Sequence, residues 1–300
     1  MSSSKHISIG PELPEFGSWN WLGIGLGNAL QSTCQTSTFT DVHHPLAADV
    51  VVFLKFKPPL ETLKQLRRQN CRLIFLPVDV YGSASEIDLD IESIGCFDLV
   101  IVSSRRHLRY FNSMANVEYV DHPLKYVLPK PRDTWTRGPS LWIGRHCNIG
   151  PVADWANQQA NLDLWVLTES EGCELSPKDL GFHNPKSVRV GTWSESKHID
   201  WLSQASVAVD IKGHDFRARH KPPAKAFDYL ASGIPVLTNQ GSSVALEMAE
   251  RNLKPLYRLP ASHSDSVSAD YLARCASAVQ RTAKPDFVWQ QMTQFVLGNS

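Results

Sequence analysis

Short apolar runs rich in β-branched residues alternate with amphipathic stretches along most of the chain. A short continuous apolar run is typical of a strand buried on both faces of a parallel sheet, whereas apolar positions three and four residues apart indicate a helix. In the first part the sequence predicts strands at residues 6–9, 50–54, 72–77, 99–102 and 117–120, and helices at 22–31, 60–68 and 106–114. This alternation predicts a series of βαβ units with right-handed crossovers.

A proline-rich segment, residues 123–139, interrupts this pattern and is the best linker candidate in the chain. The alternation then resumes, with strands expected at residues 140–143, 162–167, 187–190, 207–211 and 236–238, and helices at 151–159, 197–204, 224–230, 244–251 and 271–282. A last segment, 286–297, is expected to pack back on the first half. We therefore expect an α/β protein with an N-terminal Rossmann-like domain (1–128), a C-terminal one (129–284) and a C-terminal helix (285–300).

The composition is that of an ordinary globular protein of about two domains, with 300 residues, 42% hydrophobic and 20% charged. Lys plus Arg and Asp plus Glu are 30 each, so no overall field favours nucleic acid or an anionic membrane. Basic residues do gather in one short segment, which predicts a small polyanionic ligand. They are Lys212, Arg217, Arg219, Lys221 and Lys225.

The cysteines are dispersed, without a CxxC pair or zinc-site spacing, so we expect reduced thiols and no metal. The N-terminus lacks the apolar core of a signal peptide, and no window approaches the roughly 20 apolar residues of a transmembrane helix. These features predict a cytoplasmic location. The six cysteines are Cys34, Cys71, Cys96, Cys147, Cys173 and Cys275.

The most informative segment is residues 221–239, KPPAKAFDYLASGIPVLTN. The two prolines fix φ at the entrance of a short helix, and Gly233 ends it. A helix N-terminus stabilises an anion, and Lys225 in the first turn adds a full positive charge, so we expect a diphosphate there. Asp228 lies three residues later on the same face, where a carboxylate would accept hydrogen bonds from a ribose diol.

Lys225 followed by DYLASGIPV (228–236) resembles the donor-site signature of GT-B glycosyltransferases of the group 1, family 4-like type. The resemblance implies two Rossmann-like domains facing across a cleft, with the C-terminal helix crossing back to the first. It also implies metal-independent transfer of a sugar from a nucleoside-diphosphate sugar, with UDP or GDP expected, to an acceptor hydroxyl. Related retaining enzymes carry an acidic residue eight positions before the helix carboxylate, where this chain has His220.

Further donor-site residues follow from the same resemblance. Gly144 and Arg145, after the first strand of the second half, are expected to face the diphosphate, with a loop cap as the alternative for Arg145. Trp193 would either stack on the nucleotide base or serve as a packing residue. Planar, permanently charged Arg is well suited to phosphate. The full predicted donor set is Gly144, Arg145, Trp193, Arg219, Lys221, Lys225, Asp228 and Thr238.

On the acceptor side, the resemblance places the loop after the first strand at the ligand. Gly17 and Ser18 would let backbone amides approach it, and Trp19 would either stack on a sugar or pack in the core. Asp79, after the strand at 72–77, is the preferred general base, with a turn cap as the alternative. Competing bases are His122 and the pair His43 and His44.

Other classes of function stay open. The run GIGLGN (23–28) lacks a preceding strand in the right place for a dinucleotide fingerprint, which argues against an oxidoreductase. A sugar-nucleotide epimerase, a non-catalytic protein that binds nucleotide sugars, and a plain α/β binding protein are the alternatives. Expected partners are a nucleotide sugar and a carbohydrate or lipid-linked acceptor, without nucleic acid, and peripheral membrane contact stays open.

Overall fold

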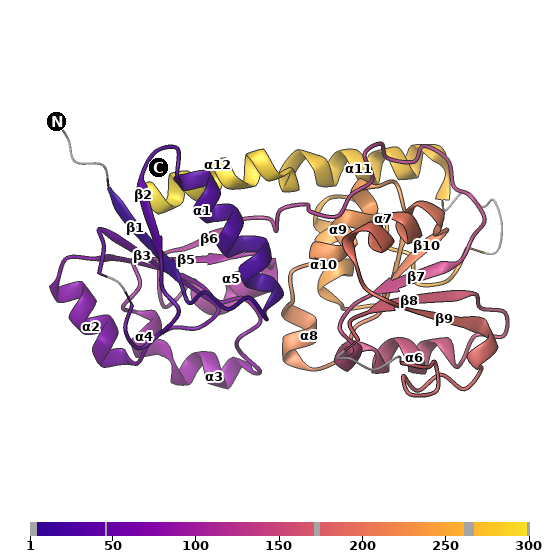
Figure 1. Cartoon of the computed structure of the whole chain (residues 1–300), viewed down its shortest axis with the longest axis horizontal. Coiled ribbons are helices and arrows are strands. Elements are labelled where there is room, and N and C mark those ends of the chain that lie inside the picture. The colour runs from indigo at the N-terminus through magenta and orange to yellow at the C-terminus, as the bar shows by residue number, and fades with distance from the viewer. Residues whose placement is uncertain (1–4, 46, 171–174, 261–266, 299–300) are drawn as a thin grey trace. The chain divides into compact units, whose positions relative to one another are not determined.

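The computed structural model describes residues 5–45, 47–170, 175–260 and 267–298. The chain divides into two compact units, each an α/β arrangement around one parallel sheet (Figure 1). The first unit contains the chain up to Pro123, the stretch Asp215–Pro222 and the chain from Lys284 on. The second contains Leu124–His214 and Pro223–Ala283. The sequence therefore places the second domain's start a few residues too late, and it does not indicate that Asp215–Pro222 belongs to the first unit.

The sheet of the first unit has the strand order β2-β1-β3-β4-β5-β6, all parallel. Every residue of β3 is buried, as its continuous apolar run predicts. The edge strand β2 was not expected, because its sequence QTST has no apolar run and none of its residues is fully buried. The strands are β1 (His6–Gly10), β2 (Gln35–Thr38), β3 (Val50–Leu54), β4 (Arg72–Leu76), β5 (Leu99–Val102) and β6 (Val117–Tyr119).

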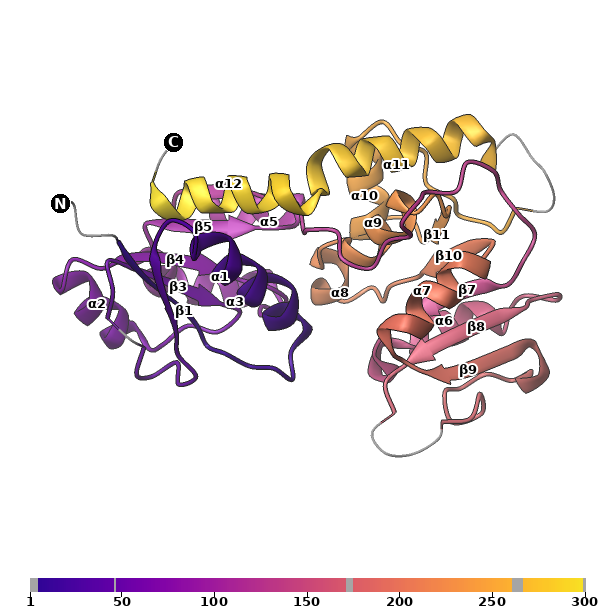
Figure 2. The ribbon, with the colours of Figure 1, turned by 45° about the horizontal axis from the view of Figure 1, so that its top comes forward.

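The C-terminal helix α12 (Pro285–Leu297) packs on α1 (Ile24–Leu30), as expected from the sequence (Figures 1 and 2). Val288, Met292 and Val296 have no exposed surface and complete the apolar cluster under the sheet. The other helices of this unit are the π-helical turn η1 (Trp19–Gly23), α2 (Leu60–Arg68), α3 (Ala84–Leu89), α4 (Ile91–Ile94), α5 (Arg105–Phe111) and α8 (Phe216–His220).

The sheet of the second unit has the order β11-β10-β7-β8-β9, again all parallel. The chain builds β7, β8 and β9 to one side and then returns to place β10 on the other side of β7. The strand order therefore reverses between β7 and β10. The strands are β7 (Ser140–Ile143), β8 (Leu164–Thr168), β9 (Val188–Thr192), β10 (Val207–Asp210) and β11 (Val236–Thr238).

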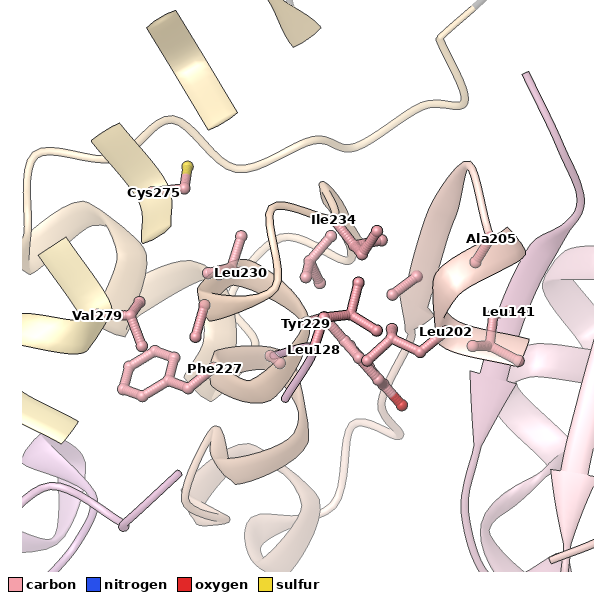
Figure 3. Close-up of a cluster of buried hydrophobic side chains, with 14 of the residues drawn as sticks. Leu128, Leu141, Leu202, Ala205, Phe227, Tyr229, Leu230, Ile234, Cys275 and Val279 are labelled. Atoms are coloured by element: carbon pink, nitrogen blue, oxygen red, sulfur yellow. The ribbon is translucent and has the colours of Figure 1, made fainter. Parts of the chain in front are cut away.

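Helix α9 (Ala224–Ala231) forms the centre of the largest apolar cluster of this unit, shown in Figure 3. Phe227 and Leu230 pack with Cys275 and Val279 of α11 (Ala269–Ala283). Gly233 has a φ of +72° and ends α9 as predicted. The remaining helices are η2 (His146–Asn148), α6 (Gly150–Ala156), η3 (Pro185–Ser187), α7 (Glu195–Gln204) and α10 (Ser243–Glu250).

The expected linker, residues 123–139, is not a free connection, because buried side chains of α9 hold its backbone. The carboxylate of Asp228 accepts the backbone N–H of Lys125 at 2.9 Å and that of Tyr126 at 3.2 Å. Ser232 Oγ accepts the N–H of Leu128 at 3.0 Å. From Leu124 on, this segment is therefore an ordered part of the second unit.

Candidate functional site

Polar side chains gather at the carboxyl edge of the second unit's sheet. In open α/β sheets, ligands bind outside the carboxyl ends of the strands where the strand order reverses, which here is between β7 and β10. The loops after β7, β8, β9, β10 and β11 carry Arg145, Glu169, Trp193, Lys212 and Asn239 respectively.

The amino end of α9 reaches this edge through Lys225. The Lys225 ammonium donates to the carbonyl oxygen of Ile143, the last residue of β7, at 3.1 Å. Pro223 precedes the helix and provides no side-chain cap. The first N–H groups of a helix lack partners within the helix and carry partial positive charge. A cation and a helix amino end therefore lie together at the end of the central strand.

The loop after β7 is held by Glu169, which the sequence reasoning did not single out. Glu169 Oε1 accepts from Arg145 Nε at 3.2 Å and from the backbone N–H of His146 at 3.3 Å. Gly144 extends the sheet, since its N–H donates to Leu167 O at 3.0 Å. Arg145 is more than half exposed, so an anion at this edge would compete with Glu169 for its guanidinium. Only the position of Glu169 directly after a buried strand signals it in the sequence.

Trp193 follows β9 and keeps 39% of its surface exposed, with its ring edge-on to Tyr126 at 5.7 Å. Its indole N–H donates to Nδ1 of His198 at 3.3 Å. His198, on α7, is 1% exposed, and burial together with the Lys225 ammonium lowers its pKa to about 4. Trp193, His198 and Lys225 are thus neighbours. His198 was missed because a single histidine in a helix carries no pattern.

Two residues predicted to bind the sugar donor are instead buried and hydrogen-bonded to the backbone of the second unit. Asp228 has no exposed surface, and its two oxygens accept the backbone N–H groups of Lys125 and Tyr126. Burial raises its pKa to about 7 against the opposing effect of these hydrogen bonds and of the nearby lysines. These contacts give Asp228 a structural role in place of the expected contact with a ribose. Thr238 is 1% exposed, and its hydroxyl donates to Asp210 O at 2.9 Å.

Arg219 and Lys221 were expected in a loop of the donor domain, but they belong to the first unit. Arg219 lies on α8, whose Phe216 and His220 pack on α5. The His220 ring stacks on that of His107 at 5.2 Å, and its Nδ1 lies 2.7 Å from Phe216 O. His220, where retaining enzymes carry an acid, is therefore a packing residue here.

The acceptor-side candidates all lie in the first unit. Trp19 is only 4% exposed and packs in the core, so the core alternative holds and it offers no face to a sugar. Gly17 is exposed, and a Cβ there would have no atom within 4 Å. Ser18 is partly buried.

The candidate bases differ in their surroundings. Asp79, in the loop after β4, adopts a φ of +53°, and its Oδ1 has no hydrogen-bond partner among the described residues. Ser83 caps α3 by accepting the Glu86 N–H, so Asp79 is not that helix's cap. His122 is 5% exposed and lies edge-on to Trp21 at 4.6 Å. His44, on the surface, lies 2.8 Å from the Asp41 carboxylate.

Within the described part of the chain, no group of three or more His, Cys, Asp or Glu side chains is arranged to hold a metal ion. The described helices include none with the length and apolar character needed to cross a membrane. The described cysteines are free thiols, and Cys173 lies outside the described residues.

Neither a protein-family model nor a curated protein matches the sequence. Solved structures do match over nearly the whole chain. Sucrose-phosphate synthase from Thermosynechococcus elongatus is 13% identical with a TM-score of 0.67, covering 99% of this chain and 100% of its own. HepE of Anabaena in complex with UDP-glucose is 10% identical with a TM-score of 0.64, covering 98% and 100%.

A glycosyltransferase from Rickettsia africae ESF-5 is 8% identical with a TM-score of 0.63, and the match covers 100% of both chains. Identities of this size establish a fold and not an activity. The chain therefore has the GT-B glycosyltransferase fold, with two Rossmann-like domains and a C-terminal helix that returns to the first.

Proposed function

We propose that this protein is a glycosyltransferase that takes its sugar from a nucleoside-diphosphate donor, UDP- or GDP-linked, and binds the diphosphate at the amino end of α9. The observation that carries this proposal is the position of the Lys225 ammonium, 3.1 Å from the carbonyl of Ile143 at the end of the central strand. The match with HepE, solved with UDP-glucose, supports a nucleotide-sugar donor.

The chemistry follows from where charge develops. As the bond between sugar and diphosphate breaks, negative charge grows on the departing diphosphate, and fixed positive groups stabilise it more than they stabilise the bound donor. Lys225 and the amino end of α9 supply this stabilisation, and Arg145 joins them when it leaves Glu169. In this scheme the protein's own cations carry the charge without a metal ion. Trp193, exposed beside this edge, is the proposed platform for the base.

Asp79 is the proposed general base for the acceptor hydroxyl. Its Oδ1 is buried and accepts no hydrogen bond from the described residues, and the loop after β4 holds it at the carboxyl edge of the first unit's sheet. His122 is the weaker candidate, because its ring packs edge-on against Trp21. A base must come within hydrogen-bond reach of the hydroxyl that it deprotonates.

A ligand panel tests the donor. Thermal shifts with UDP, GDP and their sugars should show stabilisation by one nucleotide series, because a ligand that binds only the folded protein raises its stability. Lys225→Ala should abolish the shift and lower transfer on the order of 10²-fold, as the loss of one oxyanion donor does. Lys186→Ala is the matched control, since Lys186 is exposed on η3 before β9.

The same preparations separate transfer from other uses of the donor. Incubation with the nucleotide sugar and no acceptor should leave the sugar's configuration unchanged, whereas an epimerase would isomerise it. Near-normal turnover of Lys225→Ala, with a donor verified on the wild type, would contradict the proposed site.

A further inference from the structure

The hydrogen bond between Trp193 and His198 fixes where the histidine carries its proton. An indole N–H can only donate, so Nδ1 of His198 must accept at 3.3 Å. A neutral imidazole that accepts at one nitrogen carries its proton on the other. His198 therefore presents Nε2–H as a donor.

This donor has no acceptor among the described residues, although His198 is 1% exposed. The Tyr229 ring lies 6.5 Å from that of His198, and its hydroxyl lies against the backbone of Ile143 at the end of β7. In Figure 3 that hydroxyl points away from the apolar cluster formed with Leu230 and Val279. Buried polar groups are nearly always hydrogen-bonded in folded proteins, so the unpaired Nε2–H of His198 marks a place for an acceptor.

The positive charge near the His198 Nε2–H indicates which kind of acceptor binds there. Lys225, in the first turn of the same helix as Tyr229, is close enough to His198 for its ammonium to oppose protonation of the ring. A positive charge, a helix amino end and the uncharged N–H of His198 together favour an anionic oxygen over a neutral one. His198 lies on α7, so its N–H is an observation independent of the amino end of α9 and of Lys225.

We propose that His198 is a ligand-binding residue whose Nε2–H donates to an oxygen of the diphosphate held by Lys225, with Trp193 fixing the required tautomer. This role depends on the proposed function and deepens it. Through His198, the indole N–H of Trp193 then contributes to phosphate recognition, whether or not its ring stacks on the nucleotide base.

Calorimetric titration of the full-length protein with UDP and with GDP tests this role. His198→Leu removes the donor, whereas His198→Gln places an amide N–H near the position of Nε2. We expect His198→Leu to weaken nucleotide binding about tenfold and His198→Gln to stay within about threefold of the wild type. His183→Leu is the matched control, because His183 is exposed in the same unit.

Two further measurements keep the role testable if His198→Leu folds poorly. Trp193→Phe keeps a ring and removes the indole N–H, so it should weaken nucleotide binding by less than His198→Leu does. Nitrogen NMR of the free wild type should show the Nε2–H tautomer at His198, and its signal should move on addition of UDP or of inorganic pyrophosphate.

The outcomes separate this role from the proposed function. If the wild type binds UDP or GDP, Lys225→Ala loses it and His198→Leu binds normally, the diphosphate site stands and the role of His198 is overturned. A proton found on Nδ1 overturns it as well. If the wild type binds neither nucleotide nor pyrophosphate, the proposed function fails first and the role of His198 with it.

Discussion

The indole ring of Trp289, on α12, lies against the backbone of Gly25, on α1, so closely that a Cβ at position 25 would come within 2.2 Å of it. This contact brings the C-terminal helix onto the first unit. It also explains part of the run GIGLGN, whose glycines resemble a dinucleotide fingerprint. At Gly25 the missing side chain makes room for an aromatic ring of the same protein and not for a pyrophosphate.

Gly25→Ala should lower the free energy of unfolding by about 1–3 kcal/mol, the usual cost of overpacking. In an uncrowded helix the same change would be stabilising, so a lower free energy of unfolding would show that the Trp289 ring crowds position 25. Urea unfolding measures it, with Gly17→Ala as the control, since a Cβ there meets nothing within 4 Å. A Gly25→Ala protein as stable as the wild type would show that α12 does not depend on this approach.

Asp228→Asn tests the buried carboxylate that holds residues 125 and 126. The amide nitrogen cannot accept the second backbone N–H, so we expect a loss of about 1–3 kcal/mol at pH 5. Burial raises the pKa of Asp228 to about 7, so the stability gained at this group is complete below the unfolded pKa of about 3.9 and is lost as pH rises from there to about 7. The cost of the substitution should therefore shrink between pH 5 and pH 7 and stay level to pH 8. Asp154→Asn, on an exposed carboxylate of α6, should have little effect at either pH.

His107 predicts a dependence of stability on pH. Burial, and to a lesser degree His220, lowers its pKa to about 3, so the folded protein requires the neutral ring. The stabilisation is complete above the unfolded pKa of about 6.5 and is lost as pH falls from there towards 3. Between pH 7 and pH 5 the wild type should lose up to about 2 kcal/mol relative to His107→Phe, which keeps a ring in the stack.

Urea unfolding of both proteins at the two pH values measures this difference, and Asp228, which titrates in the opposite sense, cancels because both contain it. His43→Phe, at an exposed histidine, should follow the wild type. Parallel curves for wild type and His107→Phe would mean that protonation of His107 is not coupled to unfolding.

The pair Arg145 and Glu169 predicts a gain of affinity. Glu169→Gln removes the charge that competes for the guanidinium and keeps an oxygen for the His146 N–H. A partly exposed ion pair contributes about 0.2–1 kcal/mol, so UDP should bind up to about fivefold more tightly. Titrations of Glu169→Gln with and without Arg145→Ala measure it, because the gain should vanish once the arginine is absent. Weaker binding by Glu169→Gln alone would mean that Glu169 itself contacts the ligand.

The sequence predicts the regular part of the fold well, because buried parallel strands have a simple signature. The runs at 50–54, 99–102 and 140–143 coincide with β3, β5 and β7, and the helix expected at 60–68 coincides with α2. Gly233 marks the end of α9 for a local reason, its positive φ. Where one face or edge is solvated, as in β2, the apolar signal is absent and the strand is missed.

The candidate site was predicted less completely, because contacts between distant residues decide it. The resemblance around Lys225 identifies the helix, and the lysine reaches the end of β7. It does not show that the Asp228 carboxylate accepts a backbone N–H from a segment about a hundred residues earlier, or that α8 belongs to the first unit. His198 carries no local pattern and Glu169 only its position after a buried strand, and the folded arrangement brings them to Trp193 and Arg145.

The first unit is assembled from three separate stretches of the chain, and this limits how the protein can be dissected. A fragment that stops at Pro123 would lack Val288, Met292 and Val296, and the apolar surface that they cover would face water. Such a fragment should aggregate rather than fold autonomously. A separate N-terminal domain would need α12 spliced back behind it, so a chain that terminates anywhere before α12 loses part of the first unit even when the stop lies in the second.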